Sequence, residues 1–201
     1  MILALLLAAS SWVPVTSDIR HQVVDLQVRH PETQKLRSFC TGVVVQLRPV
    51  VWILTESHCL SEPYDKMDIY ADGILIEEVR RKDEVSLMTT KGSGIGRSDK
   101  WRVMPVRKDP PRPGTPVLAA GFGFGMYLVT TGIVAGYGLD DRLIYLNIEF
   151  FAGMSGGPVV DDQGRLVSLV RGVAPDADGS PNAVAFGADT PTIWAVLQPN
   201  R

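Results

Sequence analysis

The sequence predicts an all-β protein with two six-stranded antiparallel β-barrels and a C-terminal helix. Short apolar runs follow one another closely and are separated by glycine, proline and polar pairs, as in barrels built from short strands. No long amphipathic stretch separates these runs, which argues against a parallel sheet with crossover helices. With 201 residues, 45% of them apolar, the chain can fill the core of one domain or of two small barrels.

A proline cluster at residues 110–114 divides the expected strands into two sets. Successive prolines lack backbone donors and resist incorporation into a central strand. We therefore expect a first barrel within residues 21–109. The second barrel, together with the terminal helix, is expected within residues 110–201.

Each set contains six stretches with the apolar runs or alternation typical of strands. The first set comprises Val23–Val28, Thr41–Leu47, Val51–Thr55, Ile69–Ala71, Ile74–Val79 and Val85–Thr89. The second set comprises Val117–Ala120, Tyr127–Ala135, Leu143–Ile148, Val159–Val160, Leu166–Val170 and Ala183–Gly187. A helix is expected at the end of the chain, where Thr190 suits the cap and Pro191 suits the first helical position.

Residues 1–20 contain the longest apolar segment, Ile2–Val15, in which small residues follow a leucine-rich core. The segment is shorter than the roughly 20 residues needed to span a bilayer, so no stable membrane span is expected. Its composition suits a secretory signal peptide, although the basic start typical of one is missing. An uncleaved anchor and a buried first element are the alternatives. A signal peptide would make the protein secreted or periplasmic.

The charge pattern does not indicate a nucleic-acid partner. The net charge is −2, acidic and basic residues are interspersed, and the basic run Arg80–Lys82 is short. We interpret this run as the solvated end of a strand. His21 and His30 come before the strands that the pattern predicts most clearly, and both are interpreted as solvated.

Cys40 and Cys59 are the only cysteines in the sequence. Together with His58 they could be metal ligands, but no fourth ligand has suitable spacing and no CxxC motif is present. A disulfide is the better interpretation if the chain is exported, because oxidising compartments preserve such bonds. We therefore expect no metal site.

The segment Gly153–Pro158, with the sequence GMSGGP, predicts a tight turn that presents the Ser155 hydroxyl. Glycines around one serine allow neighbouring N–H groups to converge in front of the hydroxyl, as an oxyanion site requires. An ordinary loop that ends in proline is the plain alternative. Because a serine hydroxyl needs a base to remove its proton, the catalytic interpretation requires a histidine and an acid elsewhere.

His58 is the candidate base, because it follows an apolar strand where a barrel would open to solvent. A crosslink at the adjacent Cys59 would fix the backbone that carries the imidazole. The charged junction before Val85 supplies two candidate acids, Asp83 and Glu84. Adjacent strand residues face opposite ways, so only one of the two is expected to point at His58.

These motifs resemble those of the serine proteases of the chymotrypsin superfamily, and within it the compact bacterial and viral branch that includes the HtrA/Deg proteases. Thr55–Cys59, with the sequence TESHC, is similar to the family's histidine motif TAAHC, and Cys40 completes the cysteine pair. Glu84–Met88 falls where the family has its aspartate motif, and GMSGGP resembles the nucleophile motif. The resemblance continues through Ala119–Gly123 to the terminal helix and covers about residues 23–198.

The resemblance implies a serine endopeptidase with a triad of Ser155 as nucleophile, His58 as base and Glu84 as the acid. The backbone N–H groups of Gly153 and Ser155 would form the oxyanion hole. Such an enzyme needs no cofactor and acts on a protein or peptide substrate. The PDZ domain of longer HtrA relatives is not expected.

The acid departs from the family pattern. Glu84 is one methylene longer than the usual aspartate, so its carboxylate must fold back, or the strand must shift, to reach His58. Asp83 is the fallback acid, but choosing it would place the charged Glu84 in an aliphatic position of the motif.

The substrate-binding strand also departs from the pattern. Arg171, Gly172 and Val173 occupy the place where many relatives have a serine, an aromatic residue and a glycine, so Arg171 either lines the cleft or points to solvent. Glu149, six residues before Ser155, resembles by spacing the residue at the bottom of the specificity pocket. A carboxylate there would favour a basic side chain on the substrate.

Two other functions compete with that of an active endopeptidase. The glutamate in the acid position and Met154 within the nucleophile motif are compatible with a catalytically impaired pseudo-protease that binds peptides or proteins. A structural, capsid-like role is a further alternative for a double barrel. Neither the natural substrate nor the oligomeric state can be read from the sequence.

Overall fold

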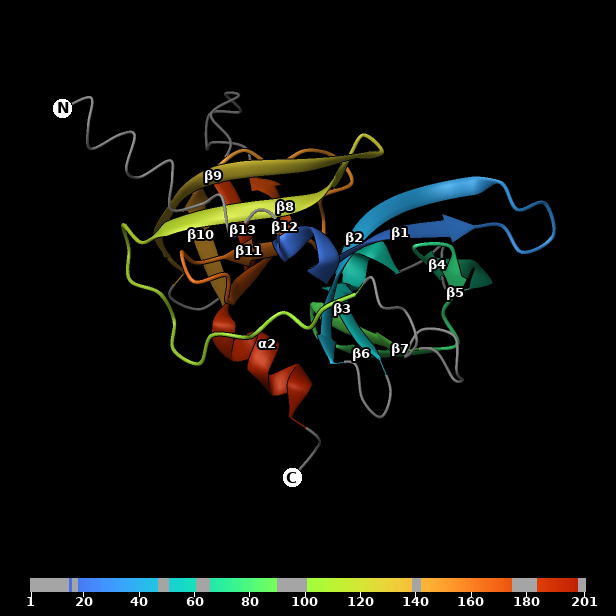
Figure 1. Cartoon of the computed structure of the whole chain (residues 1–201), viewed down its shortest axis with the longest axis horizontal. Helices are drawn as coiled ribbons and strands as arrows, with labels where there is room; N and C mark the ends of the chain where they lie inside the picture. The colour runs from blue at the N-terminus through green and yellow to red at the C-terminus, as the bar shows by residue number, and fades with distance from the viewer. Residues whose placement is uncertain are drawn as a thin grey trace.

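The computed structural model describes residues 15, 18–46, 51–60, 66–89, 101–138, 142–174 and 184–198. Most of the expected signal peptide and the glycine-rich stretch 92–96 lie outside these residues. Within them the chain is mainly β-strand, with one C-terminal α-helix, and its strands form two antiparallel sheets (Figure 1). The predicted fold class is confirmed, with one difference in the first sheet. No helix among the described residues is long and apolar enough to cross a bilayer.

The first sheet has seven strands in the order β5-β4-β1-β2-β3-β7-β6. Its strands are β1 (Val23–Arg29), β2 (Leu36–Gln46), β3 (Trp52–Glu56), β4 (Asp68–Ala71), β5 (Ile74–Leu75), β6 (Glu78–Lys82) and β7 (Val85–Thr89). Strand β2 begins at Leu36, earlier than predicted, because residues 36–40 extend the ladder with β1. These added residues are mostly not buried, so their hydrophobic pattern gives little sign of a strand.

The predicted strand Ile74–Val79 is divided into β5 and β6, which pair with opposite ends of the sheet. Strand β5 pairs with β4, whereas β6 pairs with β7. Between them, the Ile76 N–H donates to the Ile69 carbonyl and the Glu77 N–H donates to the Thr89 carbonyl. The sheet must curl strongly for two residues to join its outer strands. It is thus a half-barrel with a divided sixth strand rather than the six-stranded barrel predicted.

The second sheet is a closed six-stranded barrel in the order β10-β13-β12-β11-β8-β9. Its strands are β8 (Pro116–Gly123), β9 (Met126–Tyr137), β10 (Leu143–Asn147), β11 (Pro158–Val160), β12 (Leu166–Ala174) and β13 (Val184–Ala188). Each neighbouring pair is antiparallel. Figure 1 shows this barrel beside the half-barrel, with the connecting residues 101–115 running across both.

One hydrophobic cluster joins the two sheets. Val43 and Leu54 from the half-barrel pack in the same cluster as Leu118 and Val160 from the barrel, and all four are fully buried. Burial of apolar area stabilises a fold by roughly 25 cal/mol per Å². The contact between the sheets is therefore part of the protein's core.

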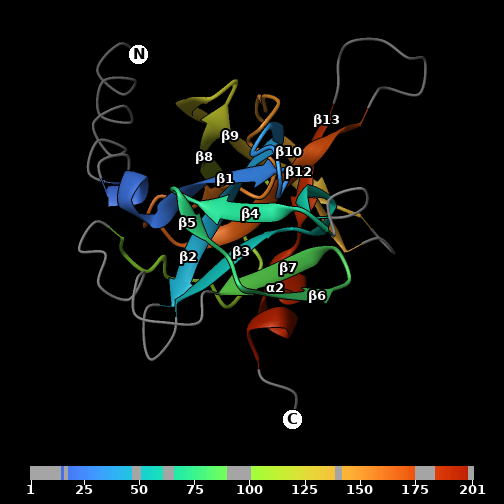
Figure 2. The same ribbon diagram turned by 90° about the vertical axis from the view of Figure 1, so that its right-hand side faces the viewer.

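The C-terminal helix α2 (Thr190–Leu197) packs beside the half-barrel, near β6 and β7 (Figure 2). Its N-cap is Asp189, whose carboxylate accepts from the Thr192 N–H at 2.8 Å, so the assignment of Thr190 as the cap was wrong. The Thr190 hydroxyl instead donates to the buried Val167 carbonyl at 2.9 Å. Pro191 takes an early helical position, as predicted.

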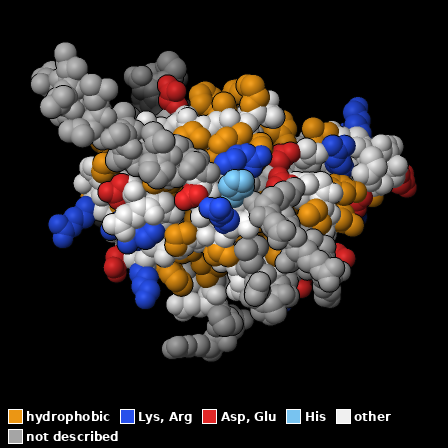
Figure 3. Space-filling view, in the orientation of Figure 1, with side chains coloured by type: hydrophobic (Ala, Val, Ile, Leu, Met, Phe, Trp, Pro, Cys, Tyr) orange, Lys and Arg blue, Asp and Glu red, His pale blue; other side chains and the backbone are white. Residues whose placement is uncertain are grey.

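The face in Figure 3 is the one that carries α2 and the connecting residues 101–115 in Figure 1. Basic and acidic side chains are interspersed among apolar ones on this face. Over the part formed by the described residues, they do not merge into a continuous field of one sign.

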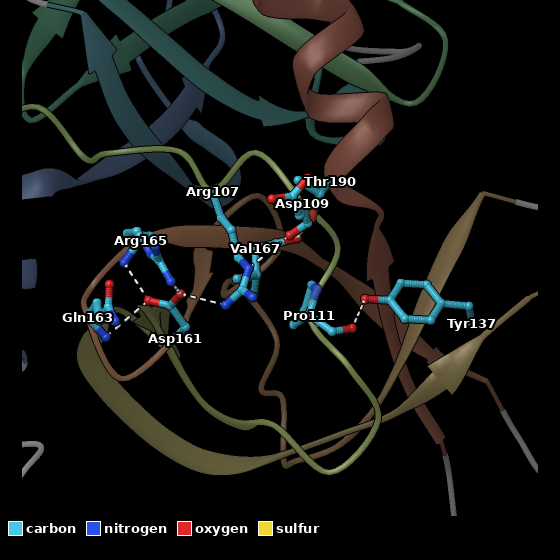
Figure 4. A network of polar contacts seen from close by, with 9 residues as sticks. All are labelled: Arg107, Asp109, Pro111, Tyr137, Asp161, Gln163, Arg165, Val167 and Thr190. Carbon is cyan, nitrogen blue, oxygen red and sulfur yellow. Dashed lines mark hydrogen bonds and ion pairs between the residues drawn. The ribbon is translucent and has the colours of Figure 1, made fainter.

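Asp161 anchors the connecting segment to the barrel (Figure 4). Its fully buried carboxylate accepts from the Arg107 guanidinium at 3.0 Å and from the Arg165 guanidinium at 2.7 Å. The backbone N–H groups of Gln163 and Arg165 donate to its other oxygen. Burial alone would raise the pKa of Asp161, but the hydrogen bonds from Arg165, Gln163 and Arg107 outweigh burial and hold it below its usual value.

Asp161→Asn should destabilise the fold by about 2 kcal/mol at neutral pH, because both arginines lose their charged partner. The lowered pKa means that the carboxylate stabilises the folded state fully above the unfolded pKa of about 3.9 and loses this effect as the pH falls through the folded pKa. Urea unfolding of the wild type and Asp161→Asn at pH 3 and pH 7 measures how the loss of stability depends on pH. Asp162→Asn, an exposed neighbour, is the control, and equal losses for the two variants would contradict the prediction.

Candidate active site

Ser155 lies in the turn between β10 and β11, and two glycines determine the shape of this turn. Gly153 and Gly156 have φ angles of +96° and +80°, which side chains rarely tolerate. A Cβ on Gly153 would collide with the Phe39 ring and the Phe122 carbonyl oxygen, and one on Gly156 would collide with the Thr55 hydroxyl. The turn that the motif predicted is therefore present and is packed against the half-barrel.

Thr41, on β2, clamps the Ser155 turn to the half-barrel. Its backbone N–H donates to the Ser155 carbonyl at 2.8 Å, and its hydroxyl donates to the Gly153 carbonyl at 2.8 Å. The same hydroxyl accepts from the Phe122 N–H at 2.9 Å, and the side chain is fully buried. Sequence analysis placed Thr41 in a strand and gave it no role at the site. These partners lie 81 to 114 residues away along the chain, so no local pattern could have identified them.

A disulfide joins Cys40 to Cys59 with a Cα–Cα distance of 6.1 Å, as expected. Both sulfurs are used in this bond, which rules out the alternative of a metal bound by the two cysteines. Cys59 Sγ also lies 3.6 Å from the Ser155 carbonyl oxygen. The residue that follows His58 is thus in contact with the backbone of Ser155. Among the described residues, no three His, Cys, Asp or Glu side chains gather as a metal site.

His58 lies in η2 (Ser57–Cys59), a 3₁₀ helix of one turn that directly follows β3. The Ser57 N–H donates to the Glu84 carbonyl at 2.8 Å, which fixes this turn against the β6–β7 hairpin. Partial burial lowers the pKa of His58, and the charge of Arg171 lowers it further, whereas Glu84 opposes both effects. The imidazole is therefore held toward its neutral form, the state in which it can accept a proton.

Glu84 and Asp83 form the two-residue turn between β6 and β7. Asp83 has a φ of +53°, and within the described part of the chain its carboxylate makes no hydrogen bond or ion pair. Glu84 Oε2 lies 2.8 Å from Arg171 Nη2, and its side chain is half-exposed. Both the backbone and the carboxylate of Glu84 thus take part in contacts at the site, with the carboxylate bound to an arginine.

Arg171 lies at a bulge in β12. Val170 pairs with Gly187 and Gly172 pairs with Phe186, so Arg171 is the extra residue of its strand. A bulge redirects a side chain, and here the guanidinium reaches Glu84. The Arg171 guanidinium also lies 5.9 Å from the centre of the Phe186 ring.

Glu149 lies just after β10, and its side chain is exposed. Its carbonyl accepts from the Thr130 hydroxyl at 2.9 Å, so its backbone is attached to β9. The structure does not bring its carboxylate into contact with the residues around Ser155. Its place at the bottom of a specificity pocket stays a prediction.

Glu56 is the last residue of β3 and lies within the histidine motif TESHC, which predicts no role for it. It is fully buried, and no hydrogen bond of normal geometry reaches its carboxylate oxygens among the described residues, although the Ala188 backbone N–H approaches them. Burial raises the pKa of Glu56 to about 8, with a further increase from the charge of Glu84 and an opposing effect from Arg171. The site therefore contains a second carboxyl group near Arg171, which is mostly neutral at pH 7.

These features define a chymotrypsin-like fold in which the η2 turn that carries His58 contacts both the turn of Ser155 and the turn of Glu84. A family model described as a trypsin-like peptidase domain matches residues 40–169, more than half of the chain. The protein belongs to this trypsin-like peptidase family. The matched segment includes Ser155, His58 and Glu84, whereas Arg171 lies just beyond it. A comparison with curated proteins found no significant match.

Thr41→Val should lower the free energy of unfolding by about 1–3 kcal/mol, because it leaves the Gly153 carbonyl and the Phe122 N–H without their partner while keeping the side-chain shape. Chemical denaturation measures the loss. Thr131→Val, on the exposed face of β9, should change stability by less than about 0.5 kcal/mol. An unchanged free energy of unfolding in Thr41→Val would mean that the hydrogen bonds of Thr41 contribute little to stability.

Glu56→Gln should stabilise the fold increasingly as the pH rises. An acid whose pKa is raised by folding favours the folded state below its unfolded pKa, and this contribution is lost as the pH rises toward about 8. Denaturation measures the free energy of unfolding of the variant minus that of the wild type. This difference should be at least about 1 kcal/mol more favourable to the variant at pH 8.5 than at pH 5. The exposed Glu77→Gln serves as control, and a difference that does not depend on pH would contradict burial of an ionisable group.

Proposed function

We propose that this protein is a serine endopeptidase of the HtrA-like branch, with Ser155 as nucleophile, His58 as base and Glu84 as the acid that orients the base. The observation that carries the proposal is the meeting of the three loops. Cys59, next to His58, contacts the Ser155 backbone, and Ser57, on its other side, is bound to the Glu84 backbone. Membership of the trypsin-like peptidase family supports the same assignment.

In this mechanism Ser155 Oγ forms a bond to the scissile carbonyl carbon while its proton passes to His58. The tetrahedral intermediate collapses when the amine leaves, and His58 returns the proton to that amine. Water then attacks the acyl-enzyme by the same route and regenerates the Ser155 hydroxyl. The lowered pKa of His58 keeps the base unprotonated before attack, and the charge of Glu84 favours the imidazolium during it.

The oxyanion hole in this proposal consists of the N–H groups of Gly153 and Ser155. Within the described part of the chain, the backbone bonds of the turn use the N–H groups of Met154, Gly156 and Gly157, and not those of Gly153 or Ser155. Those two N–H groups are thus available to a developing oxyanion, a contribution typically worth about 3 kcal/mol for each donor.

We assign substrate binding to Arg171, Gly172 and Glu149 around this centre. Gly172, on β12, would offer its backbone to an extended protein or peptide substrate, and Arg171 would set the polarity beside it. Glu149 is exposed, so its carboxylate would attract a basic residue at the surface of the cleft.

The disulfide supports a secreted or periplasmic location, with residues 1–20 as a signal peptide. We also propose that the chain divides into a half-barrel within residues 21–109 and a barrel with the terminal helix within residues 110–201. The described strands of the first sheet end at Thr89, and those of the second begin at Pro116.

A second candidate function is that of a pseudo-protease that binds peptides or proteins without cleaving them. The ion pair between Arg171 and Glu84 favours it, because this contact engages the carboxylate that should orient His58. An acid held by an arginine stabilises the imidazolium less well. In proteases with a Ser-His-Asp triad, loss of the acid lowers turnover by about 10⁴-fold.

A fluorophosphonate probe distinguishes the two functions, since labelling requires an activated serine and no knowledge of the substrate. Ser155→Ala and His58→Ala should abolish labelling, and Glu84→Ala should slow it by about 10²-fold or more. Asp83→Ala is the matched control and should label as the wild type does. Folded wild type that does not label, but binds a partner as well as Ser155→Ala does, would establish the pseudo-protease instead.

A further inference from the structure

Glu56 is a buried acid that the proposed mechanism does not use. It ends β3, pairs with Val85 of β7, and lies two residues before His58. None of its surface is exposed, and no hydrogen bond of normal geometry reaches its carboxylate oxygens among the described residues, although the Ala188 backbone N–H approaches them and lowers the pKa of the group. Such a group is costly to bury, and buried polar groups of this kind cluster at functional sites.

The charged groups that face Glu56 come from two elements. Arg171 faces it from β12, and Glu84 faces it from the β6–β7 turn, while the backbone of Ala188 faces it from β13. Ala188, Arg171 and Glu84 also line a cavity of about 100 Å³, to which Thr192 of α2 contributes. Asp83, Arg142 and Thr192 complete the lining of this cavity.

Arg171 thus acts on two carboxyl groups of the site. It pairs with Glu84 at 2.8 Å, and its charge also acts on Glu56. While Glu56 is protonated, Arg171 is attracted mainly to Glu84. Once Glu56 carries a charge, the two carboxylates repel each other and compete for the same guanidinium. The adjacent cavity borders both members of the Arg171–Glu84 pair.

We propose that Glu56 is a positioning residue of the active site, which competes with Glu84 for Arg171 and thereby sets how far the Glu84 carboxylate is free to hold His58. This inference rests on the proposed function. When Glu56 is neutral, Arg171 remains on Glu84 and weakens its hold on His58. When Glu56 is ionised, Arg171 turns toward it, and Glu84 is released to His58.

The consequence is an activity that increases in the alkaline range, after His58 is already neutral. His58 supplies the first step of the pH profile, at or below its usual range. Glu56 supplies a second step near pH 8, at which the acid of the triad becomes available. A merely structural Glu56 would change stability and would add no second step to the profile of the active site.

The test compares wild type, Glu56→Gln and Glu77→Gln by two readouts between pH 5 and pH 10. The first is the NMR titration of the His58 ring, which does not depend on catalysis. The wild type and Glu77→Gln should show a second inflection near pH 8, and Glu56→Gln should lack it. The same single inflection in all three proteins would overturn the proposal.

The second readout is the rate of fluorophosphonate labelling. Glu56→Gln should label like the wild type at pH 6 and about threefold or more slowly at pH 9, a coupling typical of groups in one charged network. Equal rates at pH 9 would overturn the proposal. If the wild type does not label but its His58 ring shows the second inflection that Glu56→Gln lacks, the coupling stands and the proposed protease function fails.

Discussion

The attachment of the Ser155 turn to the half-barrel is the constraint on which the rest of the site depends. Thr41 joins the two halves through its backbone and its hydroxyl, in a region from which water is excluded. In such surroundings a hydrogen bond left unmade is costly, so the turn has one strongly preferred position. The glycines at 153 and 156 are needed because side chains there would collide with groups of this contact. The disulfide beside His58 completes the arrangement from the other side.

Electrostatics determine what this scaffold can do. Arg171 lies where the charges of Glu84, Glu56 and His58 converge, and it acts on all three. It pairs with one carboxylate, opposes the protonation of the imidazole and favours the ionisation of the buried acid. A single residue on a strand bulge thus links the ionisation states of the site. Under the proposed function, how this cation is shared decides between cleavage and binding alone.

Local patterns in the sequence predicted much of the fold, because alternation and turn residues are properties of neighbouring positions. They identified the region of every strand found, the Cys40–Cys59 disulfide and the turn at Ser155. The extension of β2 and the division of β5 from β6 were missed, since both arise from pairing with distant strands. The same reason hid Thr41 and Glu56, whose partners lie far away along the chain. No composition or motif reveals that a glutamate within a histidine motif faces an arginine more than 100 residues later.

The shared core of the two sheets also bears on how the protein matures. Val43 and Leu54 pack with Leu118 and Val160, and the turn that carries Ser155 is shaped by groups from β2. During synthesis the half-barrel emerges first, and the Ser155 turn acquires its shape only when the barrel closes against it. A nascent chain therefore lacks an assembled site. The candidate active site is thus complete only when both sheets have come together.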